Sequence, residues 1–254
     1  MVLRTAWPAL LILTIGLAWL PSLATAALVK PALAYLVPGA PGGMVGFVRT
    51  LIWRATHSLL AAAATAIALS RLANEPRIEP RHILKRAIRA APIILAYSLA
   101  LDWNLFARPW LGPLADRVDS PAAITVTVAA TLTPFAAAPL LALLTPAAVA
   151  ETGRPGRAIA RALSAIRGFR WPILVLYLLV RAAETQTSAV VRPIVFAAIR
   201  PELGSVWLTL GWTVASFPAR LINLVWIVFL AAAYFSQTEI QSRSEPAQVA
   251  EVFD

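Results

Sequence analysis

The stretch ETGRPGRAIARALSAIRGFRWPILVLYLLV, residues 151–180, joins a basic segment directly to an apolar run. At ~100° per residue, Arg154, Arg157 and Arg161 fall within about 60° of one another on a helix. The opposite side of that helix is apolar and carries Ile159, Leu163, Ile166 and Phe169. A helix with one cationic and one apolar face is typical of a segment in a membrane interface. The stretch therefore predicts an interfacial helix that leads into a transmembrane helix.

The composition of the whole chain agrees with a membrane location. Of its 254 residues, 59% are hydrophobic and only 13% are charged, which is too little polar material to cover a soluble globule. The strict alternation that a transmembrane β-strand keeps over roughly ten residues is not sustained. The sequence predicts an all-α fold, a polytopic bundle of about six transmembrane helices with basic amphipathic interfacial helices.

The predicted spans are apolar runs that can cross ~30 Å of hydrocarbon at ~1.5 Å per residue. They belong to one domain, residues 1–236, and cover residues 7–29, 55–72, 92–111, 121–149, 171–191 and 218–235. Residues 205–235 exceed one crossing, so we expect an interfacial or re-entrant helix that ends at Phe217, before the last span. The polar tail, residues 237–254, is predicted to be disordered and cytoplasmic. Residues 1–26 also resemble a signal peptide that ends in Ala-Thr-Ala, but the uncharged run continues beyond this site, which favours a retained span.

Basic residues cluster on one predicted side of the membrane. The first inner loop carries Arg71, Arg77, Arg81, Lys85, Arg86 and Arg89, and the second carries Arg154, Arg157, Arg161, Arg167 and Arg170. With Arg4 and Arg243, thirteen basic residues lie on this side, against four in the proposed outer loops. The positive-inside rule therefore predicts that both termini are cytoplasmic.

The two basic loops are candidate contact sites for anionic lipid headgroups or for a protein partner. The candidate contact residues are Arg81, Lys85, Arg86, Arg89, Arg154, Arg157 and Arg161. The net charge of +10 does not indicate nucleic-acid binding, because the basic residues adjoin apolar spans rather than form a separate polar domain.

The segments after the two basic loops are similar. Aligning Pro92 with Pro172 matches PIILAY at residues 92–97 with PILVLY at residues 172–177. This match suggests a two-fold repeat. Alternatively, a composition rich in Ala, Leu and Ile gives such matches by chance. In this alignment Asp102 and Arg181 both lie ~15 Å past their prolines, near mid-bilayer. Since an unpaired intramembrane charge is costly, we hypothesise a polar cluster of Asp102, Arg181, Glu184 and Arg220. Alternatively, both helices end early and these residues lie among the outer headgroups.

Motifs for catalysis and metal binding are absent from the sequence. His57 and His82 have no carboxylate at ligand spacing, and the chain contains no cysteine. No phosphate-binding glycine loop, HExxH or GxSxG motif occurs. The sequence therefore predicts no enzymatic activity, no metal and no cofactor.

The region around the second basic loop also carries a family pattern. It reads Pro146-Ala-Ala-Val-Ala-Glu151, then Gly153, Ala160-Arg161-Ala162-Leu163, Ile166-Arg167-Gly168 and Trp171. This pattern resembles bacterial multi-pass proteins grouped with the membrane domain of glycerophosphoryl diester phosphodiesterases. Ser164 and Ala165 depart from the R-S-W run that is usual there. The resemblance implies a multi-pass envelope protein without phosphodiesterase activity, because the catalytic motifs of that activity belong to a separate soluble domain.

Together these features predict a non-enzymatic integral inner-membrane protein whose cationic cytoplasmic helices contact anionic lipid or a partner. The alternative is a transporter or lipid-handling permease that uses the intramembrane polar cluster.

Overall fold

The computed structural model describes residues 42–75, 79–101, 142–152, 154–167, 170–198 and 205–253, and the isolated positions Pro8, Ile12, Gly16, Pro121, Thr125 and Val128. Within these residues all regular secondary structure is helical, as the composition predicts. The helices are α3 (Gly42–Leu72), α4 (Pro80–Leu101), α7 (Leu144–Ala150), α8 (Pro155–Ile166), α9 (Arg170–Ala198) and α10 (Ser205–Phe253).

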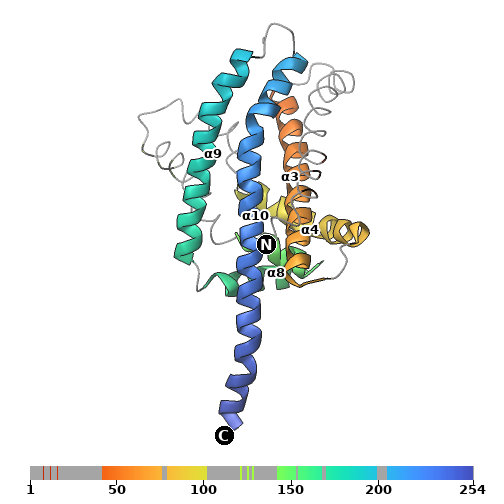
Figure 1. Cartoon of the computed structure of the whole chain (residues 1–254), viewed down its shortest axis with the longest axis vertical. Coiled ribbons are helices and arrows are strands. Elements are labelled where there is room, and N and C mark those ends of the chain that lie inside the picture. The colour runs from red at the N-terminus through yellow and green to blue at the C-terminus, as the bar shows by residue number, and fades with distance from the viewer. Residues whose placement is uncertain are drawn as a thin grey trace.

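Three of these helices contain stretches that are long and apolar enough to cross a membrane. These candidate spans are Thr50–Leu72 in α3, Trp171–Ala198 in α9 and Gly211–Glu239 in α10. Figure 1 shows the three helices side by side, with α10 between α9 and α3, and α10 contacts both neighbours. The chain runs along α9 in the opposite direction to α3 and α10, while α4 and α8 lie across the lower part of the bundle.

The observed helices cover half of the predicted spans. The spans predicted at residues 55–72 and 171–191 lie in α3 and α9, and the span predicted at 218–235 lies in α10. Nearly all of the span predicted at 7–29, half of that at 92–111 and most of that at 121–149 lie outside the described residues, so the predicted number of six is not tested. The described part of residues 92–111 continues α4 through Pro92 as far as Leu101.

The structure differs from the sequence prediction in the last helix. A break was expected between Phe217 and Pro218, but α10 is continuous from Ser205 to Phe253 and includes most of the tail predicted to be disordered. A proline removes one backbone hydrogen bond, yet a helix packed between neighbours tolerates it. Pro246 lies inside the part of α10 that belongs to this tail, and the neighbouring Glu, Ala and Gln residues favour a helix.

Alanine dominates the core at the lower end of the bundle. In α3, Ala62, Ala64 and Ala66 are completely buried, and α3 packs against α4 and α7. The facing helices supply further buried alanines: Ala87 and Ala90 from α4, Ala147 and Ala148 from α7, and Ala158, Ala162 and Ala165 from α8. Small side chains let helix backbones approach closely and gain van der Waals contact. This packing fixes the orientation of α4 and α8, and so determines which of their residues are exposed.

Candidate functional site: a basic surface and a polar cluster

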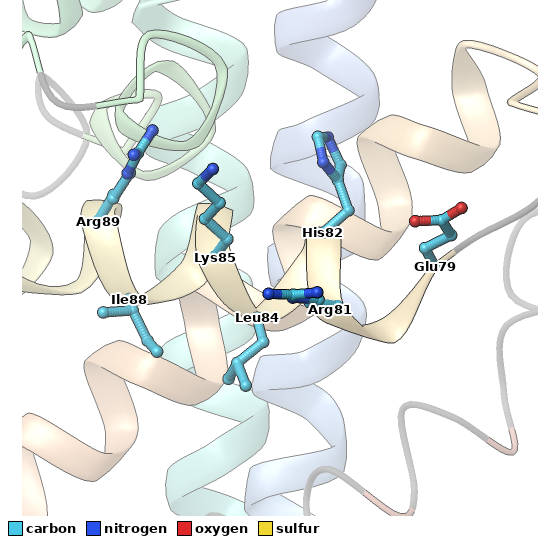
Figure 2. Close-up of a pocket in the computed structure, with 7 residues that line it drawn as sticks. All are labelled: Glu79, Arg81, His82, Leu84, Lys85, Ile88 and Arg89. Atoms are coloured by element: carbon cyan, nitrogen blue, oxygen red, sulfur yellow. The ribbon is translucent and has the colours of Figure 1, made fainter.

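The surface of α4 is divided into three sectors. Its core sector consists of the buried residues Ile83, Ala87, Ala90 and Ile94. An apolar sector follows, in which Leu84 and Ile88 are 52% and 55% exposed. The basic sector contains the exposed residues Arg81, Lys85 and Arg89, beside His82. Figure 2 shows His82, Lys85 and Arg89 extending from one side of α4, and Leu84 and Ile88 from the other.

A shallow hollow accompanies these exposed sectors of α4. It has a volume of about 540 Å³ and is lined by residues between Glu79 and Arg89, both apolar and basic. Apolar side chains and cations are therefore available on one continuous surface.

The surface of α8 has the same three sectors. Ala158, Ala162, Ala165 and Ile166 are buried. Ile159 and Leu163 are 43% and 44% exposed, and Arg154, Arg157 and Arg161 are exposed on another side of the helix.

The apolar face predicted for this segment is therefore divided between the core and the exposed surface. Of its predicted members, Ile166 is buried, Ile159 and Leu163 are exposed, and Phe169 lies outside the described residues. The buried face is built mainly from alanines because they allow α8 to approach its neighbour α7 more closely than branched side chains would.

Two of the predicted contact residues are engaged within the protein. Nη1 of Arg86 lies 3.5 Å from Oε1 of Glu75 and donates a 3.4 Å hydrogen bond to Oγ of Ser70, which connects α4 to the end of α3. Nη1 of Arg161 lies 2.7 Å from Oε1 of Glu151. Arg161 also interacts electrostatically with the buried Tyr234, so it connects α8 to α10.

The other five predicted contact residues point away from the bundle. Arg81, Lys85, Arg89, Arg154 and Arg157 are exposed and form no ion pair with any residue that the structure describes. Their charges are consequently available to a ligand or a surface outside the chain.

A separate polar cluster lies between the three candidate spans. Nε2 of His57 in α3 and Nδ2 of Asn223 in α10 are 3.4 Å apart. Arg54 of α3, Arg181 of α9 and Arg220 of α10 all act electrostatically on His57. Each of the three helices therefore contributes one arginine to the same region.

Aromatic rings cover part of this cluster. The ring of Trp53 stacks on that of His57 with 5.3 Å between centroids, and the guanidinium carbon of Arg54 lies 4.8 Å from the centroid of Trp53. On α9, Nε of Arg181 donates a 3.2 Å hydrogen bond to Oη of Tyr177. Stacking on aromatic rings lets a guanidinium keep its charge with fewer water contacts.

The predicted intramembrane cluster can be followed residue by residue. Arg181 and Glu184 form an ion pair, with 2.9 Å between Nη1 and Oε2, and Arg220 lies on the adjacent α10. Asp102 lies outside the described residues, so its predicted pairing with Arg181 is not tested.

The sequence reasoning gave no role in this cluster to His57 or Asn223. A signal for them does exist, because an arginine precedes each by three residues, as Arg181 precedes Glu184. Residues three apart lie on the same side of a helix, so each of the three candidate spans carries a polar pair one turn long.

Three comparisons with known proteins complete the description of these sites. No protein-family model, curated protein or solved structure matches the chain. The resemblance to the phosphodiesterase membrane domain therefore stays an expectation from sequence. Among the described residues, no group of three or more His, Asp or Glu side chains could hold a metal ion.

Proposed function

We propose that this chain is a non-enzymatic, multi-pass protein of the bacterial inner membrane that holds anionic lipid headgroups against α4 and α8. One observation carries the proposal. In both helices an alanine-rich sector is packed into the bundle, while a basic sector and a pair of large apolar side chains are exposed.

The exposed apolar pairs are suited to acyl chains. Leu84 and Ile88 in α4, and Ile159 and Leu163 in α8, are each spaced four residues apart, so each pair forms a short apolar ridge. Burying the exposed half of one such side chain contributes about 1 kcal/mol. In water these side chains stay exposed and this free energy is not gained, whereas in a membrane interface they would be buried against acyl chains.

The basic sectors are suited to the anionic headgroups beside those chains. Each cation near an anionic bilayer surface contributes about 1 kcal/mol. The five cations without an ion pair among the described residues, on α4 and α8 together, thus give the surface a preference for anionic over zwitterionic lipid. Because basic residues concentrate on the cytoplasmic side of membrane proteins, this surface is assigned to the cytoplasmic leaflet.

Lipid titration of the purified full-length chain tests this proposal. In neutral detergent, phosphatidylglycerol should raise the thermal unfolding temperature more than phosphatidylcholine does. The difference should shrink in 1 M salt, where the Debye length falls from ~8 Å to ~3 Å. Native mass spectrometry should show the same preference as retained lipid.

A multiple variant locates the effect. Replacing Arg81, Lys85, Arg89, Arg154 and Arg157 with Gln should abolish the preference for phosphatidylglycerol. The matched control is Arg192→Gln, which removes a cation that stacks on Trp212 of α10, away from α4 and α8. If the multiple variant keeps its full preference for phosphatidylglycerol, this surface is not the lipid site. Saturable binding of a soluble protein to the same surface would instead favour the protein-partner alternative.

The second candidate function is transport, and the convergence of three arginines near His57 favours it. A permease needs a water-filled path to these residues. A cysteine that replaces Asn223 would react quickly with a small aqueous thiol reagent if that path exists, and slowly if the cluster is dry. Slow reaction would therefore remove the transport hypothesis.

A further inference from the structure

Of the three candidate spans, the one in α9 is the least buried. Only 11% of its apolar stretch is buried within the protein, against 56% for the span in α3 and 39% for that in α10. Among the described helices α9 packs mainly against α10, where the ring of the buried Tyr177 contacts that of Trp226. Figure 1 shows α9 at the edge of the row of three helices. The face of α9 that points away from α10 is therefore exposed.

This exposed face follows a heptad pattern. Residues separated by alternate steps of four and three are all exposed: Val175, Leu179, Ala182, Gln186, Ala189 and Pro193. At ~100° per residue they lie opposite the buried Ile173 and Tyr177. Steps of three and four place side chains along one seam, by which two helices pack at a crossing angle of about +20°. Membrane helices pack in the same way, and small seam residues such as Ala182 and Ala189 let the backbones approach closely.

Two polar groups on this seam lack a partner among the described residues. The side chain of Gln186 is exposed and forms no hydrogen bond with any residue that the structure describes. Pro193 has no backbone N–H, so the carbonyl of Ala189 loses its usual hydrogen bond within the helix. Gln186 and Ala189 are three residues apart and lie on the same side of α9. A donor and an acceptor are thus adjacent on an otherwise apolar seam.

Both groups lie within the hydrocarbon if α9 crosses the membrane as proposed above, and the inference rests on that proposal. Trp171 is 74% exposed at one end of the span, and the guanidinium carbon of Arg192 lies 4.9 Å from the ring centroid of Trp212 toward the other. Tryptophan favours the two membrane–water interfaces. At ~1.5 Å per residue, Trp171 and Arg192 are ~30 Å apart along α9, which matches the hydrocarbon thickness. Gln186 then lies ~9 Å inside the nearer boundary, where acyl chains offer it no hydrogen bond.

We propose that this seam of α9 is the contact surface between two copies of the chain. In a parallel two-fold pair, each seam residue meets the same seam of the other copy. The amide nitrogen of Gln186 in one copy can donate to the amide oxygen of Gln186 or to the carbonyl of Ala189 in the other, and the pairing is reciprocal. A second copy therefore supplies the donors and acceptors that lipid lacks. A single polar residue in a heptad seam also fixes the register of the two helices.

Disulfide cross-linking tests this surface, because the chain contains no cysteine. Ala182 and Ala183 are adjacent and both exposed, but only Ala182 belongs to the seam. In membranes treated with a mild oxidant, Ala182→Cys and Ala189→Cys should form disulfide-linked dimers, and Ala183→Cys should form severalfold less. Equal cross-linking of Ala182→Cys and Ala183→Cys, or a cross-linked product that contains another protein, would overturn the proposal.

Energy transfer between two labelled populations of the purified full-length chain measures the affinity of the pair in phospholipid vesicles. Gln186→Leu should weaken pairing about threefold to thirtyfold, which is the contribution of interhelical hydrogen bonds in membranes. The matched control is Thr185→Val, because Oγ1 of Thr185 already donates to the carbonyl of Arg181 in its own helix, at 2.8 Å, so pairing should not change. Unchanged or tighter pairing of Gln186→Leu would contradict the role of the amide. Monomers at every protein-to-lipid ratio would show that lipid covers the seam.

Alkaline washing of the membranes distinguishes failure of this proposal from failure of the membrane location. The chain should stay in the membrane and pair there. A chain that stays in the membrane without pairing refutes the dimer alone. A chain that the wash releases refutes the membrane location, on which the lipid surface of α4 and α8 also depends.

Discussion

Replacing Arg161 separates a structural arginine from a lipid-binding one. Arg161 and Arg157 lie one turn apart on α8, and both are exposed and basic. Only Arg161 pairs with Glu151, at 2.7 Å, and lies beside Tyr234 of α10. Arg161→Gln should therefore destabilise the fold, whereas Arg157→Gln should weaken binding of anionic lipid.

The expected size of the effect follows from the exposure of the two partners. The side chain of Arg161 is 58% exposed and that of Glu151 only 11%. Exposed ion pairs contribute about 0.2–1 kcal/mol, and breaking a fully buried pair costs about 3–5 kcal/mol. Because solvent screens one partner here, we expect about 1–2 kcal/mol, a fall in unfolding temperature of roughly 2–8 °C for a domain of this size.

Intrinsic fluorescence of the nine tryptophans provides the assay during thermal unfolding in neutral detergent. A double-mutant cycle with Glu151→Gln isolates the pair from the loss of each charge alone, and the two substitutions should be less than additive. Equal loss of stability in Arg157→Gln and Arg161→Gln, or strict additivity in the cycle, would refute this reasoning.

Three further predictions concern packing and charge. Ala162→Leu should destabilise the chain by about 1–3 kcal/mol because Ala162 is completely buried. Its control, Ala160→Leu on the exposed side of α8, should change stability by less than about 0.5 kcal/mol. Comparable losses of stability in the two variants would argue against the observed orientation of α8. Glu184→Gln should lower the unfolding temperature by leaving Arg181 without its carboxylate, and an unchanged value would show that the pair contributes nothing. Pro218→Ala should preserve helix content by circular dichroism, since α10 is already continuous there, and a large gain would indicate a break instead.

The helical class and three of the helices follow from simple features of the sequence. Apolar runs with few charges identify the candidate spans in α3, α9 and α10 because their length matches a bilayer. The break expected at Pro218 does not occur. The tendency of proline to break a helix is a local property, whereas α10 is also stabilised by packing between α3 and α9, which are distant in sequence.

Which face of α8 is buried could not be read from hydrophobicity. Ile159 and Leu163 are more apolar than Ala158 and Ala162, yet the alanines face the bundle. At a membrane interface an apolar side chain has two favourable destinations, the protein core and the lipid. Close approach of backbones decides between them, and the sequence pattern does not contain that information.

The contact between His57 and Asn223 in the polar cluster could not be predicted from the sequence pattern either. The two residues are 166 positions apart, so no local pattern brings them together. The ion pair of Arg181 and Glu184, three residues apart on one helix, is local and was predictable.

The most direct test of the proposed topology uses the absence of cysteine from the sequence. Single cysteines replace Arg157 on α8 and Ala198 at the far end of α9, and a membrane-impermeant maleimide is added to spheroplasts before and after permeabilisation. If α9 crosses the membrane with α8 on the cytoplasmic side, Ala198→Cys reacts in intact spheroplasts and Arg157→Cys only after permeabilisation. Labelling of both cysteines from the same side would contradict the account.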